Sequence, residues 1–184
     1  MRLKQILSVG ACILLGTFKL AAQETKAPDL KSDLPSVNLK TLDGKVFNSA
    51  GIQNDGKPMI LDFWATWCKP CVAELVAIAD QYSDWKEETG VKLIAISIDD
   101  IRSSNTVAPF VNGKGWEYEV YLDPNGDFRR AMNVNNVPHS FILDGNGKIV
   151  SQHNTYNPGD EDKILEELKK IVVKEKEGLR DPAH

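Results

Sequence analysis

Two cysteines separated by two residues carry the clearest potential for chemistry in the chain. Cys68 and Cys71 close the segment WATWCKPC, which spans residues 64–71. Such a pair can cycle between dithiol and disulfide, bind a metal ion, or cross-link the fold. A cross-link across two residues closes too small a loop to stabilise much. A structural zinc site needs a second Cys or His pair, which the sequence lacks. We therefore predict a redox-active Cys68–Cys71 disulfide and no metal.

The predicted local structure gives the two sulfurs different roles. Cys68 falls where a strand ends, and Cys71 falls in the first turn of a helix. Backbone N–H groups and the helix dipole stabilise a thiolate there, and Lys69 adds a positive charge. We expect Cys68 to be the exposed, low-pKa nucleophile and Cys71 the buried resolving thiol. Pro70, early in the helix, limits how far the sulfurs can separate.

Two acidic residues near the pair stand where a charge is unexpected. Asp62 interrupts the apolar run from Met59 to Trp64, which is typical of a strand buried on both faces. A buried, unpaired carboxylate is unfavourable, so the pKa of Asp62 should be raised. Glu74 follows Cys71 by three residues and shares its face of the helix. Both carboxyl groups are candidates for chemistry at the pair.

The rest of the chain alternates strand and helix patterns that can position this segment. The helix after the cysteines is expected from about residue 70 to 88, because apolar residues recur at helical spacing and Gly90 follows. The expected strands are 37–42, 45–47, 59–64, 91–98, 118–122, 140–143 and 148–153. Shorter helices are expected at 106–113 and 128–132, and an amphipathic helix around 164–172 precedes a frayed tail from residue 175. This order predicts an α/β sandwich.

The N-terminal residues have the pattern of a secretory signal peptide. Arg2 and Lys4 precede an apolar run from Ile6 to Phe18, and small residues stand before Gln23. The run is shorter than the ~20 residues that span a bilayer, so an uncleaved anchor is a less favoured alternative, as is lipidation at Cys12. We predict a signal peptide over 1–22, a linker over 23–35, one domain over 36–176 and a tail over 177–184. The mature protein would be extracytoplasmic and have no integral membrane segment.

The charge balance argues against one class of partner. The chain has 22 basic and 26 acidic residues and a formal net charge of −4. Cleavage after Ala22 would remove three basic residues and no acidic one, so the mature charge would be −7. Because an acidic protein binds nucleic acid poorly, we expect no nucleic-acid partner.

The segment LDFWATWCKPC, residues 61–71, resembles the active site of the thioredoxin superfamily, and in particular the secreted TlpA/ResA-like thiol-disulfide oxidoreductases of bacteria. A hairpin before the active-site strand, Glu74, and an extra helix–strand segment at about 103–123 match that group as well. The resemblance spans roughly residues 36–173. It implies a thioredoxin-like α/β/α sandwich with a mixed central sheet, an N-terminal β-hairpin and an inserted helix–strand segment.

The resemblance also implies roles for residues beyond the pair. Val137-Pro138 precedes a strand, and in this superfamily the matching proline is cis and packs against the cysteines, while the backbone before it pairs with substrate. His139 stands where the family often has threonine, which would put a titratable group beside the disulfide, where it could tune the thiolate or bind certain substrates. Trp64 and Trp67 should shield the pair and offer an apolar docking surface.

Both acidic residues have counterparts in this superfamily. In thioredoxins an aspartate at the place of Asp62 passes protons to and from the buried cysteine. In TlpA/ResA-like proteins the glutamate at the place of Glu74 tunes thiol pKa and proton transfer. The chain has both residues, so which of them serves Cys71 is left open.

These inferences predict an extracytoplasmic thiol-disulfide oxidoreductase that acts as a monomer without a bound cofactor. It would reduce protein disulfides through Cys68 and Cys71 and take electrons from a membrane thiol reductase, as the family does. Lys69-Pro70 resembles the dipeptide of reducing members more than that of strong oxidants. The substrates are open: apocytochrome cysteines in cytochrome c maturation, secreted enzymes with labile disulfides, and general redox homeostasis all fit.

Other functions on the same fold are alternatives. A peroxiredoxin-like peroxidase uses a Pro-x-x-x-Thr-x-x-Cys loop, and neither Cys68 nor Cys71 has a threonine three residues before it. A Cu(I)-binding metallochaperone would use both cysteines and His139, although wider cysteine spacing is usual there. A pure interaction module with a vestigial pair is disfavoured because the motif is intact.

Overall fold

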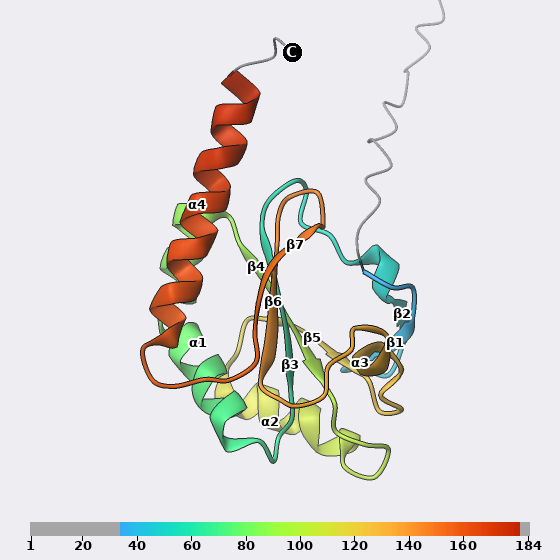
Figure 1. Cartoon of the computed structure of the whole chain (residues 1–184). Coiled ribbons are helices and arrows are strands. Elements are labelled where there is room, and N and C mark those ends of the chain that lie inside the picture. The colour runs from blue at the N-terminus through green and yellow to red at the C-terminus, as the bar shows by residue number, and fades with distance from the viewer. Residues whose placement is uncertain (1–33, 181–184) are drawn as a thin grey trace, which may run out of the picture.

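The protein is described by a computed structural model that covers residues 34–180. The predicted signal peptide over 1–22, most of the predicted linker over 23–35, and residues 181–184 lie outside the described residues. Within 34–180 the chain forms a seven-stranded sheet with helices on both faces (Figure 1). The predicted thioredoxin-like α/β sandwich is confirmed.

The sheet is mixed, as predicted. Its strand order is β2-β1-β5-β4-β3-β6-β7. The central strands β3, β4 and β5 run parallel, and β1 and β6 flank them antiparallel, each paired with an edge strand. The strands are β1 (Asn38–Thr41), β2 (Val46–Asn48), β3 (Met59–Trp64), β4 (Lys92–Ser97), β5 (Glu119–Leu122), β6 (His139–Leu143) and β7 (Ile149–His153).

The helices divide between the two faces of the sheet. They are α1 (Lys69–Thr89), α2 (Val107–Lys114), α3 (Asp127–Ala131) and α4 (Asp160–Arg180), with 3-10 turns η1 (Ser49–Gly51) and η2 (Ser104–Thr106). Residues of α1, α2 and α4 belong to one core cluster, and Phe128 of α3 belongs to the other. Figure 1 shows α1 and α4 side by side on one flank and α3 on the opposite flank.

Strand β3 separates the two halves of the core. All six of its residues are buried. Ile60 and Trp64 join the cluster beneath α1, while Leu61 and Phe63 join the cluster on the other face. Because side chains alternate along a strand, Asp62 points the same way as Ile60 and Trp64. The sheet therefore aims a carboxyl group at the helix that carries the cysteines.

The sequence accounts well for both ends of α1. Cys68 is its N-cap, and the helix ends at Gly90, which has φ of 69°. Glycine adopts this left-handed conformation without steric penalty. The observed bounds of 69–89 differ by one residue at each end from the predicted 70–88.

The C-terminal helix is longer than predicted. A frayed tail was expected from Glu175, but α4 continues to Arg180. Glu175 contributes a tertiary contact, because its Oε1 accepts a hydrogen bond from the backbone N–H of Gly145 at 2.9 Å. This bond ties the C-terminal part of α4 to the turn between β6 and β7.

Replacement of Gly145 by alanine should destabilise the fold. A Cβ atom there would overlap the backbone carbonyl oxygen of Gly56 in the loop before β3. Because the obstacle is backbone, one loop must shift, and we expect a loss of about 1–3 kcal/mol. The matched control is Gly113→Ala in α2, where nothing lies within 4 Å of the added Cβ and alanine favours the helix. The prediction would be contradicted if urea unfolding gave both variants the same free energy of unfolding.

Candidate active site

The cysteine pair lies where β3 passes into α1. Cys68 and Cys71 form a disulfide, and their Cα atoms are 5.3 Å apart. Cys71 is fully buried, and Cys68 is 5% exposed. The expectation of an exposed Cys68 is therefore wrong, because both sulfurs belong to the core cluster beneath α1. Cys68 is still the more accessible of the two.

Backbone groups of α1 favour a charge on Cys68. The backbone N–H of Cys71 donates a hydrogen bond to Cys68 Sγ at 3.3 Å. Cys68 caps a helix of 21 residues, and Pro70 lies in its first turn. The N–H groups and dipole at a helix start stabilise a thiolate. After reduction, Cys68 is thus the sulfur that best carries negative charge.

Asp99, which the sequence pattern did not single out, fixes the loop before Cys68. Its fully buried carboxylate accepts hydrogen bonds from the backbone N–H of Thr66 at 2.9 Å and from the Thr66 hydroxyl at 2.6 Å. The hydroxyl of Ser97 donates a third at 2.8 Å. These bonds hold the loop against the end of β4. An acidic residue directly after a buried strand is the signal that could have pointed to it.

The two tryptophans of the motif have different environments. Trp67 is 63% exposed beside Cys68 and is available for docking. Trp64 is fully buried and packs against Phe110 and Trp116 of the inserted segment, with ring centroids 5.8 and 5.3 Å apart. The expectation that Trp64 offers a docking surface is wrong, because the inserted segment covers it.

Asp62 and Glu74 form a buried acidic pair between β3 and α1. Asp62 is fully buried, and Glu74 is 2% exposed. Neither oxygen of Asp62 has a hydrogen-bond partner within residues 34–180, and neither does Glu74 Oε2. Buried polar atoms are usually paired, because leaving them unpaired is unfavourable. Both carboxyl groups therefore lie where their charged forms are unfavourable.

Burial raises the pKa of both carboxyl groups, as predicted for Asp62. The negative charge of Asp62 raises the pKa of Glu74 further, and Asp160 and Glu161 at the start of α4 add to the effect. Two carboxyl groups that share a buried site resist ionising together, so they titrate as a pair. Such a pair can take up a proton from a buried thiol and give it back.

The Val137–Pro138 peptide bond is cis, as the resemblance implies. Val137 packs against the core cluster that contains both cysteines. Arg129 of α3 holds the preceding loop, because its guanidinium donates to the carbonyl oxygens of Val134, at 3.0 Å, and Asn135. The sequence pattern gave no sign of this role for Arg129.

The His139 side chain lies on the face of the sheet opposite the core cluster that contains the cysteines. Its ring stacks on Phe141 with centroids 4.6 Å apart, and its Nε2 is 3.3 Å from Gln152 Oε1. Phe141 belongs to the core cluster opposite that of the cysteines, so strand alternation turns His139 away from them. Over the described residues, no group of three His, Cys, Asp or Glu could hold a metal ion. The Cu(I) alternative therefore lacks a third ligand there.

Comparison with known proteins agrees with this geometry. The family described as "AhpC/TSA family" matches residues 30–152, well over half of the chain. The chain belongs to the AhpC/TSA family. In this AhpC/TSA member, the family match covers the cysteine pair, both acidic residues and the cis-proline, so the whole site lies inside the shared region.

The relatives of this AhpC/TSA member include thiol-disulfide oxidoreductases. It is 33% identical over 120 residues to the thiol-disulfide oxidoreductase ResA of Bacillus thuringiensis, which covers 65% of this chain and 66% of that protein. The match thus spans just under two thirds of that relative. The ResA of Bacillus cereus is 29% identical over 165 residues, 90% of this chain and 89% of the relative.

Solved structures show the same fold. An uncharacterized thioredoxin-like protein from Porphyromonas gingivalis is 48% identical, with a TM-score of 0.70 over 83% of this chain and 95% of the other. A putative thiol:disulfide interchange protein DsbE from Chlorobium tepidum is 26% identical, with a TM-score of 0.66 over 77% and 96% of the two chains. The predicted thioredoxin-like fold is confirmed, and the names of the ResA relatives agree with the predicted resemblance.

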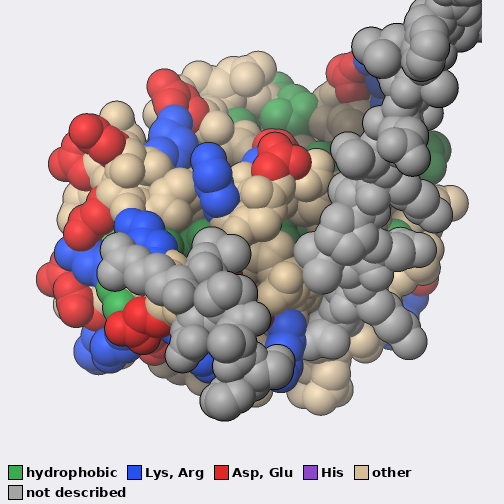
Figure 2. Space-filling view, turned by 90° about the horizontal axis from the view of Figure 1, so that it is seen from above, with side chains coloured by type: hydrophobic (Ala, Val, Ile, Leu, Met, Phe, Trp, Pro, Cys, Tyr) green, Lys and Arg blue, Asp and Glu red, His purple; other side chains and the backbone are tan. Residues whose placement is uncertain are grey.

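Two surface observations bear on partners. In the part of the chain that the structure covers, no helix is both long and apolar enough to cross a bilayer. Acidic and basic side chains are interspersed on the face shown in Figure 2.

Proposed function

We propose that the protein is an extracytoplasmic thiol-disulfide oxidoreductase that reduces disulfides in other proteins. The observation that carries the proposal is the pairing of a helix-capping Cys68 with a buried Cys71 in one disulfide. A partly accessible sulfur at a helix start is suited to attack, and a buried neighbour is suited to resolve. The names of the ResA relatives support the same class of reaction.

The cycle uses the pair in two steps. The Cys68 thiolate attacks one sulfur of a substrate disulfide, a mixed disulfide forms, and the other substrate sulfur leaves with the electron pair. Cys71 then loses its proton to Asp62 or Glu74 and attacks Cys68. The enzyme disulfide forms, and the second substrate sulfur leaves reduced. Trp67 and the backbone at Val137 would hold the substrate chain beside Cys68.

The direction of electron flow is reduction of the substrate. Lys69-Pro70 between the cysteines resembles the dipeptide of reducing relatives. Two electrons must then return to the protein disulfide in every cycle, and a membrane thiol reductase would supply them. No bound cofactor is needed, because the two sulfurs carry both electrons. The protein would act as a monomer.

The location follows from residues 1–22. This segment has the charge and apolar pattern of a signal peptide, and export would place the pair where disulfides form. Mass spectrometry of the protein from fractionated cells should find Gln23 as the first residue outside the cytoplasm. An intact, unmodified N-terminus in the cytoplasmic fraction would refute export.

A protein-disulfide reduction assay tests the activity. The reduced protein, supplied with a dithiol, should accelerate the precipitation of insulin that follows cleavage of its interchain disulfides. Hydrogen peroxide with the same dithiol tests the peroxidase alternative. Peroxide consumption without insulin reduction would replace the proposed function with that alternative.

A further inference from the structure

Three polar residues form a row across neighbouring strands on the cysteine side of the sheet. Asp62 of β3 is paired with Ser140 of β6, and Ser140 is paired with His153 of β7. Residues paired in this way have Cβ atoms about 4.5–5.5 Å apart on the same face. Asp62 and Ser140 are buried, while the His153 side chain is 28% exposed. The row therefore leads from the interior toward the edge of the sheet.

The inner part of this row has unused hydrogen-bonding capacity. Ser140 is 1% exposed. Its hydroxyl, like both oxygens of Asp62, has no hydrogen-bond partner among residues 34–180. His153 at the outer end has a partner, since its Nε2 is 3.3 Å from Glu167 Oε2. Buried hydroxyl and carboxyl groups without fixed partners are free to donate or accept in either direction. No hydrogen bond joins Ser140 to Asp62 or to His153 in the structure, so a proton passes along the row only when these side chains reorient toward one another.

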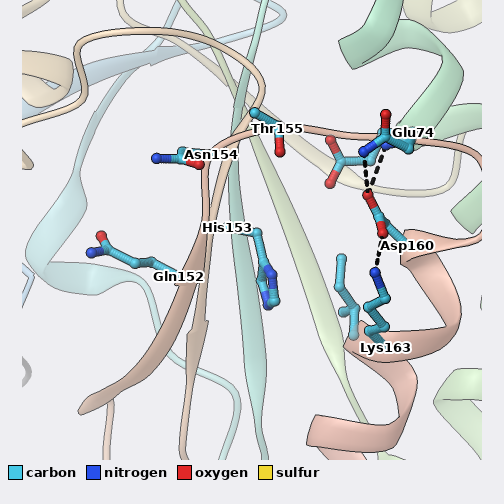
Figure 3. Close-up of a pocket in the computed structure, with 9 residues that line it drawn as sticks. Glu74, Gln152, His153, Asn154, Thr155, Asp160 and Lys163 are labelled. Atoms are coloured by element: carbon cyan, nitrogen blue, oxygen red, sulfur yellow. Dashed lines mark hydrogen bonds and ion pairs between the residues drawn. The ribbon is translucent and has the colours of Figure 1, made fainter.

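The row ends at a polar pocket of about 310 Å³. Figure 3 shows Glu74 entering the pocket from α1, Asp160 from the start of α4, and His153 and Thr155 from β7 and the loop after it. Glu74 is the link to the interior, because its unpaired Oε2 is buried while its side chain lines this pocket. The pocket is thus lined both by Glu74 and by His153, the outer residue of the row.

The resolving step of the proposed cycle delivers the proton of Cys71 to the Asp62–Glu74 pair. When Cys71 attacks the mixed disulfide, its S–H bond breaks and a new S–S bond forms, and the substrate sulfur departs with the electrons of the bond that breaks. The proton passes to a carboxylate of the Asp62–Glu74 pair. The pair binds its own proton tightly, so that proton must reach solvent before the pair can take the proton of Cys71, although Cys71 and Asp62 are fully buried.

We propose that this pocket is the port through which the proton reaches solvent, and that Ser140 and His153 connect Asp62 to it. The inference rests on the proposed function, because a dithiol cycle is what releases the proton. The groups that face the pair are Asp160 and Glu161 of α4, with Lys163 paired to Asp160 at 2.6 Å. Tyr156 of the loop donates to Glu161, and Glu167 faces His153. These charged groups keep the mouth of the pocket polar.

A two-phase reaction separates this proton step from the first attack. Reduced protein mixed with the disulfide 5,5′-dithiobis(2-nitrobenzoate) releases one coloured thiolate when Cys68 attacks and a second when Cys71 resolves. A residue that only relays a proton changes the rate of a step and does not change the free energies of its reactant and product. We expect His153→Ala and Ser140→Ala to slow the second phase at least about tenfold, with the first phase and the reduction potential unchanged.

Imidazole distinguishes a proton route from a packing effect. In His153→Ala the missing ring leaves space in a pocket that is open to solvent, so added imidazole should restore the second phase. It should not accelerate the wild-type protein or Glu166→Gln, a control in α4 whose side chain is 64% exposed and outside the pocket. Slowed phases should also show a larger rate ratio between water and deuterium oxide.

Three outcomes would contradict the proposal that the proton reaches solvent through this pocket. They are an unchanged second phase in His153→Ala, a slowed phase that imidazole does not restore, and an unchanged second phase in Ser140→Ala. Failure of the proposed function has a different signature, since the wild-type protein would then reduce no insulin disulfides while both phases with the small disulfide remained.

Discussion

Replacement of Cys68 by serine should reduce disulfide reductase activity by at least about 10³-fold, because a serine hydroxyl cannot replace the thiolate nucleophile. Replacement of Cys71 by serine should instead trap the substrate. Cys68 would still attack from its position at the start of α1, but no thiol would remain within reach to resolve the mixed disulfide. Insulin reduction measures the first variant, and non-reducing electrophoresis with mass spectrometry detects the covalent adduct of the second.

The two variants control for each other. Both substitutions replace sulfur by oxygen at buried or nearly buried positions, so a loss of stability would affect them alike. Only Cys71→Ser should form an adduct, and the double variant should form none. An active Cys68→Ser protein, or an adduct through Cys71 in that variant, would reverse the assignment of nucleophile and resolving thiol.

Removal of the buried acidic pair should slow the second step of the cycle by about 10²-fold, the usual contribution of a positioned proton acceptor. Asp62→Asn and Glu74→Gln keep the shapes of the side chains and remove one carboxyl group each. The second thiolate release reports the effect, and the control is Asp84→Asn on the exposed side of α1. If one variant alone is slow, that residue serves Cys71. Wild-type kinetics in the double variant would exclude both acids from proton transfer.

The same substitutions should increase the stability of the oxidised protein at high pH. The folded state raises the pKa of both carboxyl groups, so it binds their protons more tightly than the unfolded chain does. Stability therefore falls as pH rises from the unfolded pKa values near 4 toward the raised folded values, and it stays low above them. Each neutral substitution removes part of this fall, and we expect a gain of about 1–3 kcal/mol at pH 8.

Urea unfolding of the oxidised proteins at pH 5 and pH 8 measures this effect. The gain in Asp62→Asn and Glu74→Gln should be larger at pH 8 than at pH 5, and Asp84→Asn should show no such difference. A gain that is the same at both pH values would mean that the carboxyl groups do not titrate in this range in the folded protein.

The sequence was sufficient for the parts of the site that are local in the chain. Cys68 and Cys71 are three residues apart and Glu74 is three further on, so helix geometry alone relates them. Asp62 was recognisable because a charge interrupts an apolar strand, and the structure buries it completely. The helix ends were recognisable for the same local reasons, namely the motif before Cys68 and Gly90 after Thr89.

What the sequence could not supply depends on pairing between distant segments. Asp99 bonds to Thr66, 33 residues earlier, and no local pattern announces that contact. The face that His139 occupies depends on the register of β6 against β3, which the sequence does not give. The row through Ser140 and His153 exists only when three strands are aligned. The contact from Gly145 to Glu175 of α4 likewise joins segments 30 residues apart.

The reduction potential of the Cys68–Cys71 pair tests the central claim most directly. The protein is equilibrated in dithiothreitol or glutathione buffers of known potential, and tryptophan fluorescence is followed because Trp67 adjoins Cys68 in the chain. We expect one reversible two-electron transition near or below about −250 mV, close to that of thioredoxin and suited to reducing protein disulfides. A transition near about −120 mV would identify an oxidant that introduces disulfides, and no reversible transition would remove the dithiol cycle altogether.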